Sequence, residues 1–262
     1  MTIYMKDTMI EYENLAKLNA PFFEELQESF STTLNSGWYI LGGNVKRFEE
    51  AYANHHHVKH CVGVNSGLDA MLLALKAFGF KEGSEVIVPS NTYIATILAV
   101  LQAGLVPVLA EPDIHTYNIS PEEIEKKITP KTAAVLPVHL YGKCCDMKSI
   151  LALKEKYGFK LIEDCAQSHD AAQSGKLTGT FGEYGAFSFY PTKNLGALGD
   201  AGAILTDDDD LALAVRRLRN YGSDIKYYNE VAGYNSRLDE MQAGFLSVKL
   251  KHLERITKHK RE

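Results

Sequence analysis

The 262-residue chain has few of the features that mark secreted, membrane or nucleic-acid-binding proteins. It has only four cysteines, none in CxxC spacing, which excludes a disulfide scaffold. No apolar run is long enough to span a bilayer, and the first residues carry acids where a signal peptide would carry bases. The net charge of −5 gives no attraction for nucleic acid or an anionic membrane. We therefore expect a cytoplasmic protein without nucleic-acid or membrane partners.

Short apolar segments alternate along the chain with longer amphipathic ones. The apolar segments predict strands at 61–64, 85–88, 106–110, 133–138, 160–163, 185–189 and 201–206. The segments between them predict helices at 68–78, 92–103, 121–128, 146–157 and 209–220. This alternation predicts an α/β fold with a mostly parallel, mixed central sheet and helices on both faces.

Polar or small residues stand where several predicted strands end, which is the edge at which ligands bind in such sheets. Asn65-Ser66-Gly67 leads from a strand into a helix, whose free amides suit an anion such as phosphate. Taken alone, this turn is more typical of a tight connection without a ligand. The chain has no GxGxxG and no GxxxxGK[ST] motif, so dinucleotide and P-loop binding lose their best support.

Two further segments carry a carboxylate and an amine. Asp164 ends an apolar strand, where it either pairs with a cation such as a protonated ring nitrogen or caps the next turn. Lys193 follows an aromatic strand and lies in a loop of small residues, where a sheltered amine can attack a carbonyl, although a lone lysine there is usually a surface charge. Together the three segments predict a ligand with a phosphate, a protonated ring nitrogen and an aldehyde. Pyridoxal 5′-phosphate has all three.

Ordered motifs along nearly the whole chain resemble the DegT/StrS-type sugar aminotransferases, a branch of the fold-type I pyridoxal-phosphate enzymes. They lie at 36–42, 65–70, 89–96, 137–142, 163–169, 188–200 and 233–240. The resemblance implies a cofactor-binding large domain at 1–237 with an N-terminal helical segment. It also implies that 238–262 forms a helix leading into a small C-terminal domain that is largely absent, so we expect a truncated chain.

The resemblance assigns roles at the cofactor ring. Lys193 would form the Schiff base and then move the proton between substrate and cofactor. Asp164 would pair with the pyridine nitrogen and keep it protonated, which makes the ring an electron sink. Tyr93 would stack on the ring, and Gln167 would lie beside its phenolic oxygen.

The resemblance also assigns the phosphate site. Ser188 and the backbone amides of Gly67 and Leu68 would hold the phosphate. Asn235 would reach the phosphate of the neighbouring subunit, so the active unit would be a homodimer with shared sites.

The resemblance further implies the substrates. Such enzymes pass an amino group from an amino acid, usually glutamate, to a keto sugar on a nucleotide carrier. The loop Lys193 to Asp200 is most similar to that of relatives that aminate C3 of a dTDP-linked 3-keto-6-deoxyhexose, in deoxyamino-sugar biosynthesis for lipopolysaccharide or surface polysaccharide.

Some positions depart from the pattern of the family. Asp170 stands where relatives usually have Gly, and Asp tolerates a positive φ better than most residues. Ala201 replaces a second Gly, and Leu68 stands where many members have Thr. A helix over 238–257 would carry an apolar stripe, part of which we expect to be exposed without the small domain.

Other functions are left open by the same residues. One is a truncated member that binds cofactor without turnover, and another is a pyridoxal-phosphate-dependent sugar dehydratase, although such relatives carry His in place of Lys193. A hydrolase built from Ser188, His139 and Asp164 has less support because no GxSxG motif is present. We expect no metal site, since the adjacent side chains of His55-His56-His57 point in different directions on a helix and are better explained by a solvated face.

Overall fold

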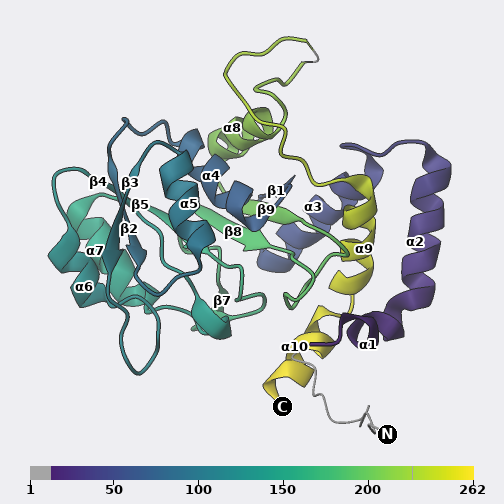
Figure 1. The fold of residues 1–262 in the computed structure, drawn as a ribbon, viewed down its shortest axis with the longest axis horizontal. Coiled ribbons are helices and arrows are strands. Elements are labelled where there is room, and N and C mark those ends of the chain that lie inside the picture. Colours follow the sequence, from purple (N-terminus) through teal and green to yellow (C-terminus); the bar gives the residue numbers. More distant parts are fainter. Residues whose placement is uncertain (1–12, 226) are drawn as a thin grey trace, which may run out of the picture.

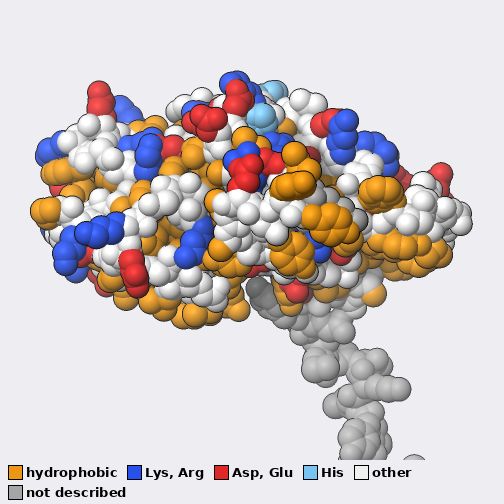
Figure 2. All heavy atoms as spheres, turned by 90° about the horizontal axis from the view of Figure 1, so that it is seen from above, with side chains coloured by type: hydrophobic (Ala, Val, Ile, Leu, Met, Phe, Trp, Pro, Cys, Tyr) orange, Lys and Arg blue, Asp and Glu red, His pale blue; other side chains and the backbone are white. Residues whose placement is uncertain are grey.

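A seven-stranded sheet forms the centre of the molecule in a computed structural model that describes residues 13–225 and 227–262 (Figure 1). Its order is β1-β9-β8-β5-β4-β2-β3. The strands are β1 (His60–Val64), β2 (Glu85–Pro89), β3 (Val106–Ala110), β4 (Thr132–Val135), β5 (Lys160–Asp164), β8 (Tyr184–Ser188) and β9 (Gly202–Thr206). All neighbours pair in parallel except β9, which is antiparallel to β8 and β1. On the face that Figure 2 shows, hydrophobic side chains lie among charged and polar ones.

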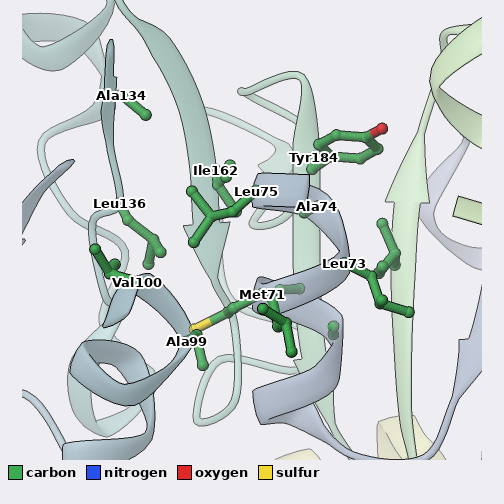
Figure 3. Packing of buried hydrophobic residues seen from close by; sticks show 14 of the residues in the cluster. Met71, Leu73, Ala74, Leu75, Ala99, Val100, Ala134, Leu136, Ile162 and Tyr184 are labelled. Atoms are coloured by element: carbon green, nitrogen blue, oxygen red, sulfur yellow. The ribbon is translucent and has the colours of Figure 1, made fainter. Parts of the chain in front are cut away.

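One face of the sheet is covered by α4 (Gly67–Ala77), α5 (Ile94–Gln102) and α8 (Asp209–Arg219). Alternate strand residues belong to the core on this face, among them Val86 and Val88 of β2 and Ile162 of β5. Figure 3 shows Ile162 beside Leu75 of α4. Because successive side chains of a strand point to opposite faces, the residues between them belong to the other layer.

The opposite face is covered by two groups of helices. Helices α6 (Pro121–Lys127) and α7 (Met147–Tyr157) pack over Ile87, Val135 and Leu161. Helix α3 (Gly43–His56) and helix α9 (Glu240–Leu250) pack over Phe187 and Leu205, and α2 (Phe23–Ser36) packs outside α9. The predicted α/β fold with helices on both faces is therefore confirmed.

The N-terminal helical segment consists of α1 (Leu15–Asn19), η1 (Ala20–Phe22), α2 and α3. Two short elements were not predicted, the β6–β7 hairpin (Ala172–Gln173 and Lys176–Leu177) and η2 (Leu140–Gly142). The strand predicted at 133–138 ends at Val135, since Pro137 has no N–H to donate, and Val138 keeps only an isolated bridge to Asp164.

The predicted single helix over 238–257 is wrong. It is two helices, α9 and α10 (Leu253–Arg261), separated at Lys251 and His252. The expected exposure of its apolar stripe is also wrong, because Phe245 and Val248 pack on α2 and the preceding turn, and Leu253 joins the cluster under β8 and β9. Within the described residues, no helix is both long and apolar enough to cross a membrane.

Candidate active site

A cavity of about 580 Å³ opens at the carboxyl ends of β1, β2, β5 and β8. This is the edge that the sequence predicts, because β1 runs in the same direction as β8, and β9 alone runs against them. The cavity is lined by seven of the eight predicted site residues, which are Gly67, Leu68, Tyr93, Asp164, Gln167, Ser188 and Lys193.

The first turn of α4 forms one wall of the cavity. Ser66 is the N-cap, and its hydroxyl accepts a hydrogen bond from the amide of Asp69 at 3.1 Å. The amides of Gly67 and Leu68 precede the first intrahelical hydrogen bond, so they are available to a ligand beside the Ser188 side chain. Together with the partial positive charge at a helix N-terminus, they make a site for a phosphate.

Gly67 is required by close packing rather than by its backbone angles. A Cβ at this position would lie 2.6 Å from Cβ of Ser188. A glycine therefore lets α4 approach β8 closely enough for Ser188 and the helix N-terminus to contact the same group.

Asp164 lies at the opposite wall, at the end of β5, and is 5% exposed. Its Oδ2 accepts a hydrogen bond from Thr96 Oγ1 at 2.9 Å, and its Oδ1 accepts one from the Ala166 amide at 3.0 Å. Burial raises the pKa of this carboxyl above its usual value, although both hydrogen bonds and the charge of Lys193 oppose the rise. Among the described residues, no cation lies within ion-pair distance of it, so a cationic ligand group in the cavity would stabilise it.

Lys193 is half-buried in the turn that follows β8, and its amide donates to the Tyr190 carbonyl at 2.8 Å. Burial lowers the pKa of its ammonium, while Asp164 and Glu13 oppose this effect. A lysine whose pKa is lowered holds a larger fraction of neutral amine at pH 7, and the neutral amine is the nucleophile.

Tyr93 and Gln167 complete the walls from two other loops. Tyr93 is the N-cap of α5, and 75% of it is exposed, so its ring is free to cover a planar ligand. Gln167 accepts a hydrogen bond from the Tyr141 amide at 2.7 Å through its Oε1, which fixes the side-chain amide at the rim.

These residues fit pyridoxal phosphate. Its phosphate matches the donors at Gly67, Leu68 and Ser188, and its basic ring nitrogen matches the buried carboxylate of Asp164. Its aldehyde matches the amine of Lys193.

Asn235 is the one predicted site residue outside the cavity. It is exposed, forms an isolated bridge with Asn220 and is not among the residues that line the cavity. Its proposed contact with a neighbouring subunit therefore stays a prediction.

Both histidines near the site have structural hydrogen bonds. His139 bonds Glu163 Oε2 at 2.9 Å and accepts from the Cys145 amide at 3.1 Å, so neither ring nitrogen is free to serve Ser188 in a hydrolase triad. His169 bonds the Tyr52 hydroxyl and the Ser188 carbonyl, both at 2.9 Å.

One buried cluster of the described residues combines side-chain types that can bind a metal ion. His139, Glu163 and Cys165 have ligand atoms within 4.8 Å of one another. The Glu163 carboxylate, however, already accepts hydrogen bonds from His139 and from backbone amides of the loop at 179–182.

The solvated face expected for the histidine run is wrong for His55 and His56, while His57 is exposed. His56 is buried, and burial lowers its pKa to about 3. His55 pairs with Asp170 at 2.6 Å.

A second chamber of about 620 Å³ adjoins the cavity and shares Lys193 and Gln167 with it. Lys260 and Arg261 of α10 line its outer part. Asp170 has a φ of 61°, as its replacement of Gly suggested, and it accepts hydrogen bonds from Thr257 and, through its carbonyl, from Arg261. Sequence reasoning missed this chamber, since nothing local in the sequence shows that α10 returns to Lys193.

The chain matches the DegT/DnrJ/EryC1/StrS aminotransferase family over residues 22–262. It belongs to this family. It is 53% identical over 254 residues to dTDP-3-amino-3,6-dideoxy-alpha-D-galactopyranose transaminase of Aneurinibacillus thermoaerophilus. The aligned region covers 97% of this chain and 70% of that relative. DesV of S. venezuelae, solved in complex with a ketimine intermediate, superimposes with a TM-score of 0.92 at 46% identity, over 94% of this chain and 66% of DesV.

A third relative bears on the cofactor. NtdA of Bacillus subtilis, solved with bound cofactor PMP, superimposes with a TM-score of 0.86 at 33% identity, over 95% of this chain and 58% of NtdA. The family resemblance predicted from the motifs is thus confirmed, and the family is one of pyridoxal-phosphate enzymes. The chain spans 70%, 66% and 58% of the lengths of these three relatives.

Proposed function

We propose that this chain acts in the pyridoxal-phosphate-dependent transfer of an amino group from an amino acid, with glutamate as the expected donor, to C3 of a dTDP-linked keto-deoxyhexose. The observation that carries the proposal is the cavity itself, which combines a helix N-terminus, a buried carboxylate and a half-buried lysine at one sheet edge. The identity of 53% to a dTDP-3-amino-sugar transaminase supports the sugar and the position of amination.

Pyridoxal phosphate supplies, when bound, a carbonyl that accepts the amino group and a ring that stabilises negative charge on the neighbouring carbon. Asp164 holds a proton on the ring nitrogen through a charge-assisted hydrogen bond. The amides of Gly67 and Leu68 and the hydroxyl of Ser188 hold the phosphate in place. Lys193 would supply the amine that holds the cofactor, and the same amine would carry a proton to or from the reacting carbon.

The chamber beside Lys193 is the proposed entry for both substrates. An amino acid donor has carboxylates and the sugar nucleotide has a diphosphate, and Lys260 and Arg261 give this chamber positive charge. A homodimer in which Asn235 reaches the partner's cofactor is part of the same proposal.

The first experiment is labelling of Lys193. The full chain is mixed with pyridoxal phosphate, reduced with borohydride and mapped by mass spectrometry, with Lys193→Ala in parallel. We expect a pyridoxyl group on the peptide with Lys193 and none there in the variant. An unlabelled wild-type chain would contradict the cofactor site.

Turnover separates the remaining alternatives. Glutamate and a dTDP-3-keto-6-deoxyhexose should give an amino sugar and 2-oxoglutarate in equal amounts. Free ammonia together with 2-oxoglutarate and a deoxygenated sugar, in place of the amino sugar, would instead indicate a dehydratase. Labelling without any turnover would indicate a cofactor-binding protein.

A further inference from the structure

Lys249 is a buried lysine that the proposed chemistry leaves unused. It lies on α9 and is 2% exposed. Its Nζ donates to the carbonyl of Gly196 at 2.5 Å, and among the described residues no carboxylate pairs with it. An ammonium buried with one carbonyl and no counterion costs stability, and an apolar side chain of the same length would cost less.

The carbonyl that Lys249 contacts belongs to the loop that carries Lys193. The first part of this loop folds back on the end of β8, where the Lys193 amide bonds the Tyr190 carbonyl and the Ala197 amide bonds the Phe189 carbonyl. At Gly196 the chain passes so close to itself that a Cβ would lie 2.3 Å from the Pro191 carbonyl oxygen. These contacts make the loop a tight turn, in which the Gly196 carbonyl accepts a hydrogen bond from Lys249 of α9.

Helix α9 holds the same loop at a second place. The Leu198 amide donates to Gln242 Oε1 at 2.8 Å, and Gln242 lies two turns before Lys249 on α9. The first of the two contacts, at Gly196, is three residues from Lys193, so a shift of the Gly196 carbonyl changes the direction of the Lys193 side chain.

We propose that Lys249 is a positioning residue for Lys193: by holding the Gly196 carbonyl from α9 it directs the Lys193 amine into the cofactor cavity. The inference rests on the proposed function, since it gives Lys193 the amine that binds the cofactor. It explains why a residue that lowers stability occupies an otherwise apolar helix position.

The contact also depends on pH. Burial lowers the pKa of Lys249 to about 8, and the positive charge of Lys260 on α10 contributes to the decrease. A charged ammonium makes a stronger hydrogen bond than a neutral amine. The bond from Lys249 to the Gly196 carbonyl therefore weakens as the pH rises through 8. The pKa of Lys193 is also lowered by burial, and the effects of the two lysines are separated by comparing variants.

The test uses the full chain and measures how fast pyridoxal phosphate, fixed by borohydride, labels Lys193 between pH 7 and 9.5. Lys249→Met removes the donor and leaves an unbranched side chain one atom shorter. Lys251→Met, at an exposed position on the same helix end, is the matched control. At pH 7 we expect labelling of Lys249→Met to be about ten- to a hundredfold slower than wild type. The control should label at the wild-type rate.

Thermal unfolding of the same proteins without cofactor distinguishes positioning from a structural role. Lys249→Met should have a Tm equal to or above that of wild type while its labelling falls, whereas a purely structural lysine would lower both. The difference in labelling rate between Lys249→Met and wild type should also become smaller as the pH rises through 8, because wild type then loses the charged donor as well. If Lys249→Met does not fold, Lys249→Gln takes its place. Its shorter, neutral donor should give a labelling rate between those of wild type and Lys249→Met, and the difference from wild type should again be smaller at pH 9.

Two negative results would refute different proposals. If wild type labels and the folded variant labels equally fast at every pH, Lys249 does not position Lys193. If wild type itself is not labelled, the proposed function fails before the role of Lys249 is reached.

Discussion

At the scale of single residues, Asp164 and Lys249 share one property: each is a buried ionisable group with no oppositely charged partner among the described residues. Asp164 has two neutral hydrogen-bond donors, and Lys249 has one carbonyl. Such groups lower the stability of the chain and are expected where a ligand or a mechanism needs them.

Asp164→Asn should have opposite effects on cofactor affinity and on stability. The amide cannot form the charge-assisted bond to a protonated ring nitrogen, so the Kd for pyridoxal phosphate should rise about ten- to a hundredfold, the loss expected for a hydrogen bond to a charged group. Without cofactor, Asn removes a buried carboxylate and keeps the shape of the site, so Tm at pH 7 should stay equal or increase. Absorbance titration and thermal unfolding measure the two effects.

The pH dependence of unfolding tests the same residue. The pKa of Asp164 is raised in the folded chain, so folded protein binds more protons than unfolded protein from the ordinary carboxyl pKa upward to the raised one. Its contribution to stability therefore falls as the pH rises through that window, and Asp164→Asn should remove this fall. A variant that is less stable at neutral pH and binds cofactor normally would contradict the role.

Local sequence was enough to find Asp164 and Lys193, because each follows an apolar strand at the edge where ligands bind. It was not enough for Thr96 or for the pairing of His55 with Asp170, since these contacts join residues 68 and 115 positions apart. Lys249 could not be found either, because its position in a helical pattern is that of an ordinary charged residue until the fold buries it.

At the scale of elements, the strand and helix centres follow from sequence periodicity, and their ends follow from capping. Ser120 caps α6 by accepting from the Glu123 amide, and Asp208 caps α8. The break between α9 and α10 could not be predicted, because no proline or glycine stands at Lys251 or His252. Tertiary packing on α2 and the sheet decides it.

The approach of α4 to β8 gives a prediction for Gly67→Ala. The added Cβ would lie 2.6 Å from Ser188 Cβ, so α4 must shift and separate the two phosphate-binding groups. We expect a loss of about 1–3 kcal/mol in unfolding free energy, as for other overpacked sites, and a clear rise in the Kd for pyridoxal phosphate.

Gly43→Ala is the matched control, because Gly43 is likewise the first residue of a helix. Its added Cβ would meet only the flexible guanidinium of Arg47, at 3.1 Å. Denaturant unfolding and absorbance titration should leave the control near wild type. Equal behaviour of the two variants would show that close packing at Ser188 is not what Gly67 provides.

At the scale of the whole molecule, one predicted site residue, Asn235, does not line the cavity, and apolar surface is exposed. Trp38 is 65% exposed. A hollow of about 540 Å³ lies between α2 and the loop of Lys193, with Phe23 and Phe30 on one side and Leu198 on the other. A second copy of the chain would cover surface of this kind and would bring its own Asn235 toward the cavity, as the proposed homodimer requires.

Complementation between two defective chains tests the shared site. Asn235→Ala should weaken pyridoxal phosphate binding about tenfold or more, because it removes a hydrogen bond to a charged phosphate, and Lys193→Ala cannot be labelled at all. In a dimer that combines one chain of each kind, the Asn235→Ala chain keeps its own Lys193 and receives an intact Asn235 from the partner. The other site has both defects.

Differently tagged chains are therefore co-expressed, the mixed dimer is isolated, and borohydride labelling of Lys193 is measured at a cofactor concentration too low for the Asn235→Ala homodimer. We expect one site per mixed dimer to label with wild-type affinity. If Asn235 instead serves its own chain, the mixed dimer has no intact site and labels no better than the Asn235→Ala homodimer. If no mixed dimer forms because the chain is monomeric, the shared site is wrong, and the exposed position of Asn235 needs no partner to explain it.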